Sequence, residues 1–323
     1  MQSLFAFMIT KAVSAAASLK VADALKGGPT YYTELAAAVG AHPKALHRMM
    51  RTLACAGIFA EPSPGKYELN AVSDFLRSDH PASMRDMATM ITSESHWLPW
   101  GFFTETVRSG KSGPQHAFGT DVFSWFQREE NRAEWEIFNA AMTSFSSGVG
   151  ALVPEAYDFR RFRKIVDIGG GQGFLLRKIL ESAPEAKGVV FDLPGVAAEG
   201  DGLGPRIERV GGDFFRSVPE DGDCYTLKHI IHDWSDEHCR KILGNIRKAM
   251  SPDGRVLVIE LVMPESPEPH PAKFMDVNML AMTEGGCERT EKEYAELFTA
   301  SGLKLLKVHP TKGPLSLVEA ARA

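Results

Sequence analysis

Residues 227–239, LKHIIHDWSDEHC, carry three histidines, three acids and a cysteine within thirteen positions. Three interpretations are open: a metal site, a solvated helix start, and a histidine that takes a proton from a substrate. The spacing matches none of the known zinc-binding patterns, which disfavours a metal. Ser235 is suited to cap a helix with acids in its first turn, so we expect His238 on the helix surface. His229 and His232 follow an apolar run and are the candidates for chemistry.

A glycine-rich turn precedes this segment by about sixty residues. Gly169, Gly171 and Gly173 stand between the apolar run 165–168 and a helical pattern that starts at Phe174. A strand-to-helix turn of this kind lets a ligand approach the backbone, although a tight turn without a ligand also uses glycine. Dinucleotide folds place a third glycine where this chain has Phe174, so we expect a different cofactor.

Two further strand ends carry side chains that could hold a nucleoside. Asp192 ends the run GVVFD nineteen residues after Gly173, at the position of an acid that accepts hydrogen bonds from ribose hydroxyls. Asp213 and Phe214 follow the next strand and are suited to bind and cover an adenine. Because open α/β sheets bind ligands at the carboxyl ends of their strands, the sequence predicts a cofactor site at that edge.

The first third of the chain predicts a winged helix. We expect a helix over residues 4–26, a second over 34–39 capped by Thr33, a third over 43–56, and a hairpin from 58–60 and 66–69. Residues 1–80 hold eight Lys and Arg against six Asp and Glu, a net charge of +2. That is little positive charge for contacts with several phosphates, so we expect no nucleic-acid partner and interpret this part as a packing and dimerisation module.

Bulk composition is that of a soluble protein. The 323 residues carry a formal net charge of -5, and the four cysteines form no C-x-x-C pair, which fits a reducing compartment. The N-terminal apolar run spans only residues 4–9 before Lys11, so we expect no signal peptide and no membrane span. The sequence therefore predicts a cytoplasmic protein.

Residues 84–145 are rich in methionine and aromatic side chains. We expect most of them in the core, but thioethers and flat rings also line pockets for planar organic ligands. Candidates from this region for a substrate pocket are Trp97 and Trp100.

The motifs VDIGGGQG, FDLPGV, GGDFF, LKHIIHDWSDEHC, GRVLVIELVMP and DVNMLAMTEGGCERTEKEY occur in this order. In this combination the chain resembles the S-adenosylmethionine-dependent O-methyltransferases of the plant caffeic-acid and bacterial natural-product type, over nearly its whole length. The resemblance implies an α/β fold with a Rossmann-like seven-stranded sheet whose last strand, near residues 315–320, is antiparallel. It also implies a homodimer, with a winged-helix dimerisation domain over residues 1–98 and a methyltransferase domain over 99–323.

The resemblance also assigns roles to particular residues. His232 is expected to be the general base, with Glu260 and Glu288 orienting its imidazole, because a phenol with a pKa of about 10 must lose its proton. The expected methyl donor is S-adenosylmethionine, with S-adenosylhomocysteine as the product. The reaction is expected to need no metal. The residues expected to hold it are Gly169, Gly171, Asp192, Asp213, Phe214, Lys228 and Ser146. Phe138, Met142 and Phe145 match a helix that lines the substrate pocket in the family. Asn278, Met279 and Thr283 are expected to form another wall of this pocket.

The predicted reaction is methylation of a hydroxyl, expected to be phenolic, on a small aromatic or polyketide-like molecule. One alternative is an enzyme that uses the cofactor for hydroxylation or decarboxylation, which the complete set of His232, Glu260 and Glu288 disfavours. The other is a cofactor-sensing winged-helix protein that binds DNA.

Overall fold

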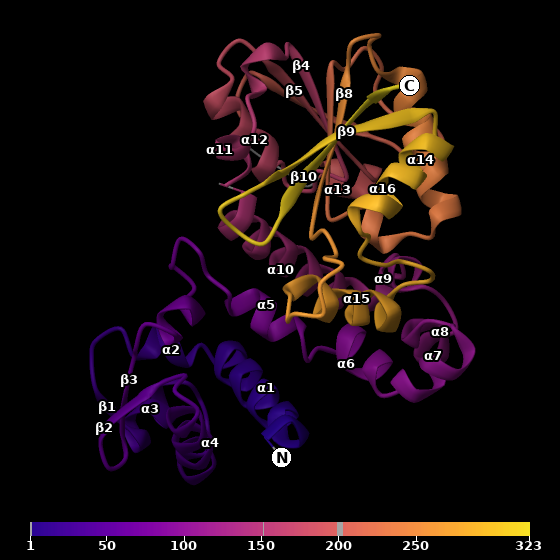
Figure 1. Cartoon of the computed structure of the whole chain (residues 1–323). Coiled ribbons are helices and arrows are strands. Elements are labelled where there is room, and N and C mark those ends of the chain that lie inside the picture. The colour runs from indigo at the N-terminus through magenta and orange to yellow at the C-terminus, as the bar shows by residue number, and fades with distance from the viewer. Residues whose placement is uncertain (1, 151, 199–202) are drawn as a thin grey trace. The chain divides into compact units, whose positions relative to one another are not determined.

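The computed structural model describes residues 2–150, 152–198 and 203–323, and the side chains of residues 2, 3 and 145–149 lie outside this description. The chain divides into two compact units (Figure 1). One consists of Met1–Trp97 and Phe126–Gly148, and the other of Leu98–Trp125 and Val149–Ala323. This division is a property of the backbone contacts, and the domain boundary at residue 98 stays a prediction.

The first unit contains the predicted winged helix. Helices α3 (Tyr32–Ala38) and α4 (Pro43–Cys55) are followed by the wing strands β2 (Ala60–Ser63) and β3 (Lys66–Glu68). A short strand, β1 (Thr30–Tyr31), pairs with β3. The remaining elements are α1 (Gln2–Ser18), α2 (Val21–Ala24), η1 (Ser73–Leu76), α5 (Arg85–Met90), η2 (Glu129–Asn131) and α10 (Arg132–Gly150).

Two local predictions in this unit were wrong. The helix expected over residues 4–26 is broken, because Lys20 adopts a left-handed conformation with φ 55° between α1 and α2. Thr33 does not cap α3, which begins at Tyr32 and has Tyr31 as its N-cap residue. Pairing with the wing explains the earlier start: the Tyr32 N–H donates to the Gly65 carbonyl, directly after β1.

The second unit is built on a seven-stranded sheet with the order β6-β5-β4-β7-β8-β10-β9. The strands β4 (Lys164–Ile168), β5 (Lys187–Asp192), β6 (Ile207–Gly211), β7 (Cys224–Lys228) and β8 (Arg255–Glu260) are parallel. The last strand, β10 (Ser316–Arg322), runs antiparallel between β8 and β9 (Leu303–Pro310). This confirms the predicted seven-stranded fold with an antiparallel last strand.

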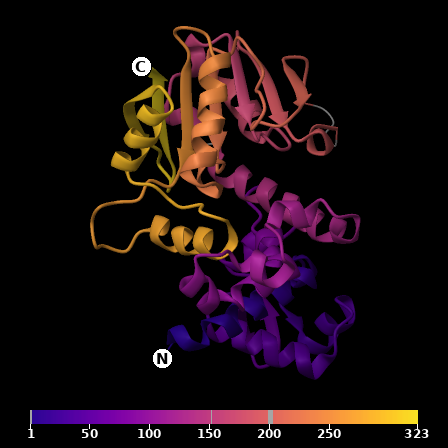
Figure 2. The same cartoon turned by 90° about the vertical axis from the view of Figure 1, so that its right-hand side faces the viewer.

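Each face of the sheet has its own core, because side chains alternate along the strands. Val166, Tyr225 and Val258 face α14 (Asp236–Ala249) and α16 (Glu291–Ala300) on one side. Alternate residues of the same strands face α11 (Val153–Ala156) and α12 (Phe174–Ser182) on the other. Figure 1 shows these two helix pairs on opposite sides of the sheet, and Figure 2 shows the orange α14 lying along the strands.

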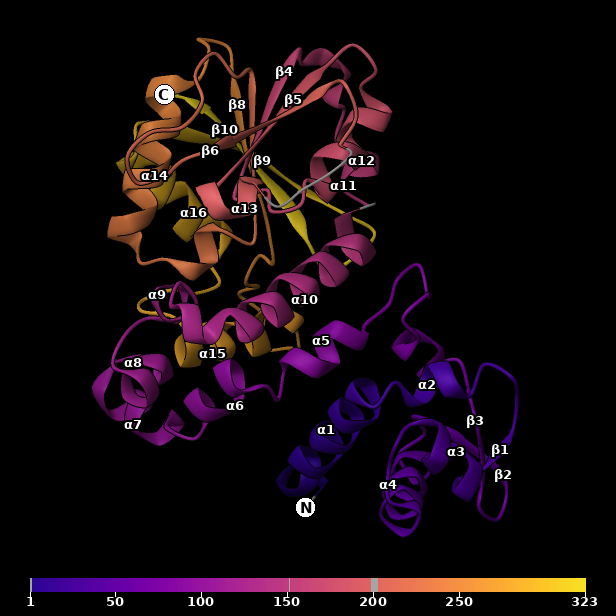
Figure 3. The same cartoon turned by 180° about the vertical axis from the view of Figure 1, so that it is seen from behind.

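Further helices belong to this unit. Helix α13 (Pro194–Ala198) lies beside β6 at the sheet edge, as seen from behind in Figure 3. The others are α7 (Phe103–Ser109), α8 (Gly113–Phe118), α9 (Val122–Phe126), η3 (Phe159–Arg161), η4 (Ile231–Asp233) and α15 (Pro271–Met282). Helix α6 (Glu94–Trp100) crosses the boundary between the units, and so do the last residue of α9 and the last two residues of α10.

The methionine- and aromatic-rich region is less buried than predicted. Among its described side chains, Met90, Trp125 and Phe126 are buried in the single chain, whereas Trp100 and Phe102 are exposed. Most of the others are half-buried, so the expectation that most of them form core was wrong for the single chain.

Candidate active site

The glycine turn lies at the carboxyl edge of the sheet, between β4 and α12. Gly169, Gly171 and Gly173 have φ angles of 65°, 53° and 75°, a region that L side chains rarely adopt. At Gly169 a Cβ atom would also lie 2.3 Å from Cδ1 of Ile230, so an added side chain would have to displace the end of that isoleucine. Beside Gly171, by contrast, no atom of the described residues other than its chain neighbours lies within 4 Å of the position of a Cβ, so these residues leave room for a ligand to approach this backbone.

Asp192 ends β5 and faces this turn. Its Oδ2 accepts a hydrogen bond of 2.8 Å from the Gly171 N–H, and its Oδ1 accepts one of 2.7 Å from the Leu193 N–H. Burial raises the pKa of this carboxyl group, and the two N–H donors act in the opposite direction. From β6, Arg209 donates to the carbonyl oxygens of Gly171 and Gln172 at 3.2 and 3.3 Å, so a cation also holds the turn.

Asp213 and Phe214 follow β6, whose last residue pairs with Asp192. Asp213 Oδ1 accepts a hydrogen bond of 2.8 Å from the Phe215 N–H, which leaves its Oδ2 directed to the ion pair with Arg216 at 3.6 Å. The ring of Phe214 meets that of Trp234 edge to face, with centroids 6.1 Å apart. The structure thus brings both residues to the same sheet edge as Asp192 and the glycine turn.

Strand β7 ends in Lys228, which pairs with Ile259 of β8 at this edge. Burial lowers the pKa of Lys228 to about 8, although the charges of Asp167 and Glu260 raise it in part. The next residue, His229, has a left-handed φ of 54°, and its ring lies 5.0 Å from that of His232. Burial, together with the charges of Lys228 and His232, holds the pKa of His229 well below its usual value, so this imidazole is neutral.

His232 lies in the η4 turn and is buried, with 5% of its surface exposed. Its Nδ1 lies 2.7 Å from Oε1 of Glu288, and its Nε2 lies 3.6 Å from Oδ1 of Asp233. Burial alone would lower the pKa of His232, but Asp233, Glu288 and Glu260 outweigh it and raise the pKa to about 9. Without cofactor, His232 is therefore a positively charged imidazolium at neutral pH. Its two nitrogens face different carboxylates.

Glu260 makes a different contact from the predicted one. Its Oε1 accepts hydrogen bonds from the backbone N–H groups of Ile230, Ile231 and His232, at 3.1, 2.7 and 3.1 Å. Its Oε2 accepts a hydrogen bond from the hydroxyl group of Tyr294. The described contacts of Glu260 thus hold the backbone of the turn, and of the two predicted glutamates it is Glu288 that contacts the imidazole, at Nδ1.

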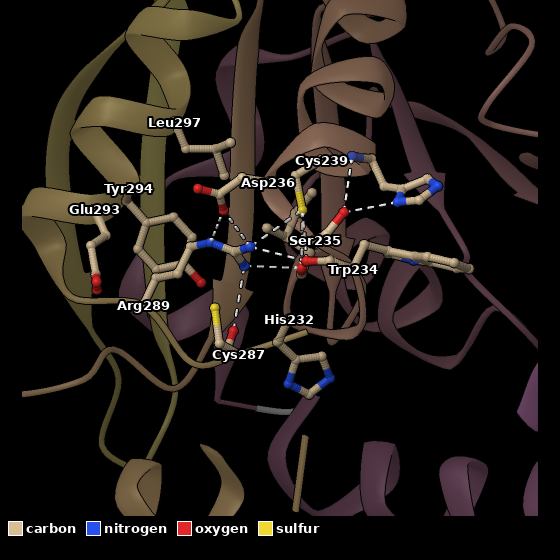
Figure 4. Close-up of polar contacts among 12 residues, drawn as sticks. His232, Trp234, Ser235, Asp236, Cys239, Cys287, Arg289, Glu293, Tyr294 and Leu297 are labelled. Carbon is tan, nitrogen blue, oxygen red and sulfur yellow. Dashed lines mark hydrogen bonds and ion pairs between the residues drawn. The ribbon is translucent and has the colours of Figure 1, made fainter. Parts of the chain in front are cut away.

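Sequence reasoning did not identify three residues at this site: Asp233, Arg289 and Tyr294. Asp233 adjoins His232 in the motif HDW, and that adjacency was the available signal. Arg289 follows Glu288 and is 2% exposed, with a guanidinium group that donates to the backbone around His232 (Figure 4). Nothing in the sequence distinguished it from a surface arginine.

The predicted substrate residues lie in both units. Within the second unit, Trp100 Nε1 donates to Asn278 Oδ1 at 3.3 Å, and Met279 and Thr283 are buried on or next to the same helix, α15. Within the first unit, Phe138 stacks on His96 with centroids 6.1 Å apart, Lys11 lies over the ring of Trp97, and Met142 is half-buried. Phe145 and Ser146 belong to α10, but their side chains lie outside the described residues.

Two absences concern only the part of the chain that the structure describes. Over residues 2–150, 152–198 and 203–323, no three His, Cys, Asp or Glu side chains form a group that could hold a metal ion. None of the helices in these ranges combines the length and the apolar character needed to cross a bilayer.

Comparison with known protein families assigns both parts of the chain. Residues 100–304 match the model of an O-methyltransferase domain, and residues 1–79 match that of an O-methyltransferase dimerisation domain.

Individual relatives are similar over nearly the full length. The phenazine O-methyltransferase of Lysobacter antibioticus is 40% identical and covers 99% of this chain and 94% of that protein. The phenazine-1-carboxylate N-methyltransferase of Pseudomonas aeruginosa is 34% identical, with 97% and 94% covered. A solved O-methyltransferase from neocarzinostatin biosynthesis, in complex with S-adenosylmethionine and 2-hydroxy-5-methyl naphthoic acid, is 30% identical, with 97% and 96% covered and a TM-score of 0.81.

Proposed function

The chain belongs to the O-methyltransferase family, and from this premise we propose that it methylates a hydroxyl group of a small aromatic acceptor, with His232 as the general base. The methyl donor is S-adenosylmethionine, as in solved relatives that share this fold. The dimerisation region matched by residues 1–79 supports a homodimer. We also propose residues 1–98 as the dimerisation domain and 99–323 as the catalytic domain.

The residues at the sheet edge fit this cofactor. The room that the described residues leave beside Gly171 allows close approach to the backbone, and Asp192 retains lone pairs for ribose hydroxyls while both its oxygens bind backbone N–H groups. Asp213 and Phe214 would hold the adenine, and Lys228 would contribute a charge at the same edge. When bound, S-adenosylmethionine supplies an electrophilic methyl group on a positively charged sulfur, and this charge disfavours a protonated imidazole in the same site.

The contact between His232 and Glu288 is the observation that carries the proposal. With Nδ1–H donating to Glu288, only Nε2 can accept a proton from an acceptor. As the acceptor oxygen forms its bond to the methyl carbon, the carbon–sulfur bond breaks with its electron pair remaining on sulfur. The hydroxyl proton passes to Nε2, and Glu288 balances the charge of the resulting imidazolium.

An aromatic acceptor with a hydroxyl group agrees with the naphthoic acid bound by the neocarzinostatin relative. An amine acceptor is the second candidate, since the Pseudomonas relative is an N-methyltransferase. A base adjacent to the acceptor favours oxygen, because a phenol with a pKa of about 10 is mostly protonated at neutral pH.

The test is methyl transfer from labelled S-adenosylmethionine to a panel of phenols, hydroxynaphthoates, anthraquinones and matched aromatic amines. We expect His232→Ala to lower kcat by roughly 10²- to 10⁴-fold, the usual contribution of general base catalysis, with little change in cofactor affinity. His238→Ala is the matched control, because this exposed histidine lies in the same motif on α14. Unchanged turnover in His232→Ala, or transfer only to amines, would contradict the proposal.

A further inference from the structure

The turn that carries His232 is held from one side by a buried arginine. We propose that Arg289 is a positioning residue for methyl transfer, and that it fixes the backbone of η4 so that the imidazole keeps its place beside the acceptor. This inference rests on the proposed role of His232.

The contacts of Arg289 use its donors almost completely. The side chain is buried, and the guanidinium group donates to backbone carbonyl oxygens before and after His232 (Figure 4). The distances are 3.1 Å to Ile231, 3.0 Å to Trp234 and 3.4 Å to Cys287. Asp236 Oδ1 accepts two further hydrogen bonds, at 2.8 Å from Nη2 and 3.1 Å from Nε.

Arg289 and Glu260 act on opposite polar groups of the same turn. Glu260 accepts from the N–H groups of residues 230, 231 and 232, and Arg289 donates to the carbonyl groups of residues 231 and 234. His232 and Asp233 therefore lie between the two residues, 231 and 234, whose carbonyl groups both accept hydrogen bonds from the Arg289 guanidinium. A planar group with five donors can make such contacts at once, whereas a lysine has three donors at a single point.

The segment before Arg289 fits closely against the same turn. A Cβ atom on Gly286 would lie 2.4 Å from the carbonyl oxygen of His232, and one on Gly285 would lie 2.9 Å from Cβ of Ser235. Glu288, next in the chain, contacts the imidazole itself. Residues 285–289 therefore set the ring and the backbone of His232 together, and a shift of this segment changes both.

The loss of these contacts should affect the chemical step. Reacting groups must lie close to their productive positions, and a misplacement of about 1 Å can lower the rate by roughly 100-fold. The cofactor residues at β4, β5 and β6 make no described contact with Arg289. We therefore expect the effect on kcat and not on cofactor affinity.

The experiment compares Arg289→Met, Arg289→Lys and Arg206→Met in the full-length protein. Arg206 is the matched control, because its guanidinium also donates to backbone carbonyl oxygens, those of Leu180, Ala183, Pro184 and Ala186 at the end of α12. The measurements are kcat at saturating substrates, cofactor Kd by calorimetry, melting temperature, and the NMR signal of the His232 Nδ1 proton.

We expect Arg289→Met to lower kcat by about 10- to 100-fold, with Kd for the cofactor changed by less than about threefold. In this variant, the NMR signal of the His232 Nδ1 proton should shift or broaden. Arg289→Lys should recover part of kcat, and if Arg289→Met does not fold, this variant alone should show a reduced kcat and a changed signal. Arg206→Met should lower the melting temperature without affecting kcat of the folded protein.

Two results would overturn the inference. One is a wild-type kcat in Arg289→Met, or in Arg289→Lys if Arg289→Met does not fold, and the other is a loss of kcat that only follows the loss of folded protein, as in Arg206→Met. Failure of the proposed function would look different, because His232→Ala would then retain turnover. If His232→Ala is inactive and the Arg289 variants are fully active, only the positioning role is wrong.

Discussion

Replacement of Glu288 by glutamine should change the pH dependence of catalysis as well as its rate. Oε1 of Glu288 lies 2.7 Å from Nδ1 of His232, and both side chains are buried. A hydrogen bond between charged groups contributes about 1.5–3 kcal/mol, against about 0.5–1.5 kcal/mol for a neutral one. The substitution therefore removes roughly 1–2 kcal/mol of stabilisation of the imidazolium.

This energy has two consequences with opposite effects on the rate. One pKa unit corresponds to about 1.4 kcal/mol, so the pKa of His232, about 9 in the free protein, should fall by roughly one unit. A base must be neutral to accept a proton, so the acid limb of the kcat profile should move to lower pH by a similar amount. At high pH, where the imidazole is already neutral, kcat should fall by roughly 10-fold, because the developing imidazolium is less stabilised.

The assay is kcat at saturating substrates between pH 6 and 10. Because the lower pKa and the slower step offset one another below both pKa values, the rates of wild type and Glu288→Gln should converge at low pH and differ roughly 10-fold at high pH. Asp276→Asn is the control: its Oδ1 accepts the Glu288 N–H at 2.9 Å, so it tests the same segment by the same change of carboxylate to amide. A ratio of rates that is constant across pH would refute the role of Glu288 in stabilising the imidazolium.

The remaining predictions concern the turns at the sheet edge. Glu260→Ala leaves three backbone N–H groups and the Tyr294 hydroxyl without their acceptor, so denaturant titration should show the free energy of unfolding lowered by several kcal/mol and largely restored in Glu260→Gln. Gly169→Ala forces a Cβ toward Ile230 at a φ of 65°, so calorimetry should show cofactor affinity lowered at least roughly 10-fold, with His232 chemistry intact once cofactor is bound. Without cofactor, the raised pKa of His232 stabilises the fold fully below about pH 6.5, and this contribution of about 3 kcal/mol at most is lost as pH rises through about 9. The difference in the free energy of unfolding between wild type and His232→Gln should show that loss as pH rises, and a difference that does not depend on pH would contradict it.

Local sequence patterns predicted much of the fold and of the cofactor edge. The apolar run before Gly169, and Asp192 at a strand end, are short-range features, and parallel strands bring their carboxyl ends to one edge. Ser235 also caps α14 as predicted, since its hydroxyl oxygen accepts from the His238 N–H. In each case the deciding interaction spans a few residues or follows from the sheet topology.

Contacts made across the fold could not be predicted in the same way. The family resemblance assigned Glu260 and Glu288 the same role beside the histidine, but their partners depend on which atoms the folded chain presents to each carboxylate. Glu260 lies at the end of β8, directly beside the backbone of the neighbouring turn, and so receives its N–H groups. Arg289 carries a charge that sequence statistics assign to the surface, and its burial depends on Asp236 and on backbone carbonyl groups that only the folded chain brings to the guanidinium.

The two nitrogens of His232 also indicate how acceptors should differ. Nδ1 is held by Glu288, whereas Nε2 lies 3.6 Å from Asp233, whose pKa burial raises to about 6. At neutral pH the resting proton therefore stays on the imidazole and not on Asp233. A weakly acidic phenol can react only after Nε2 has lost that proton, so its rate must rise with pH. A phenol acidic enough to bind as its anion pairs directly with the imidazolium and needs no base, and its rate should depend little on pH or on the basicity of His232.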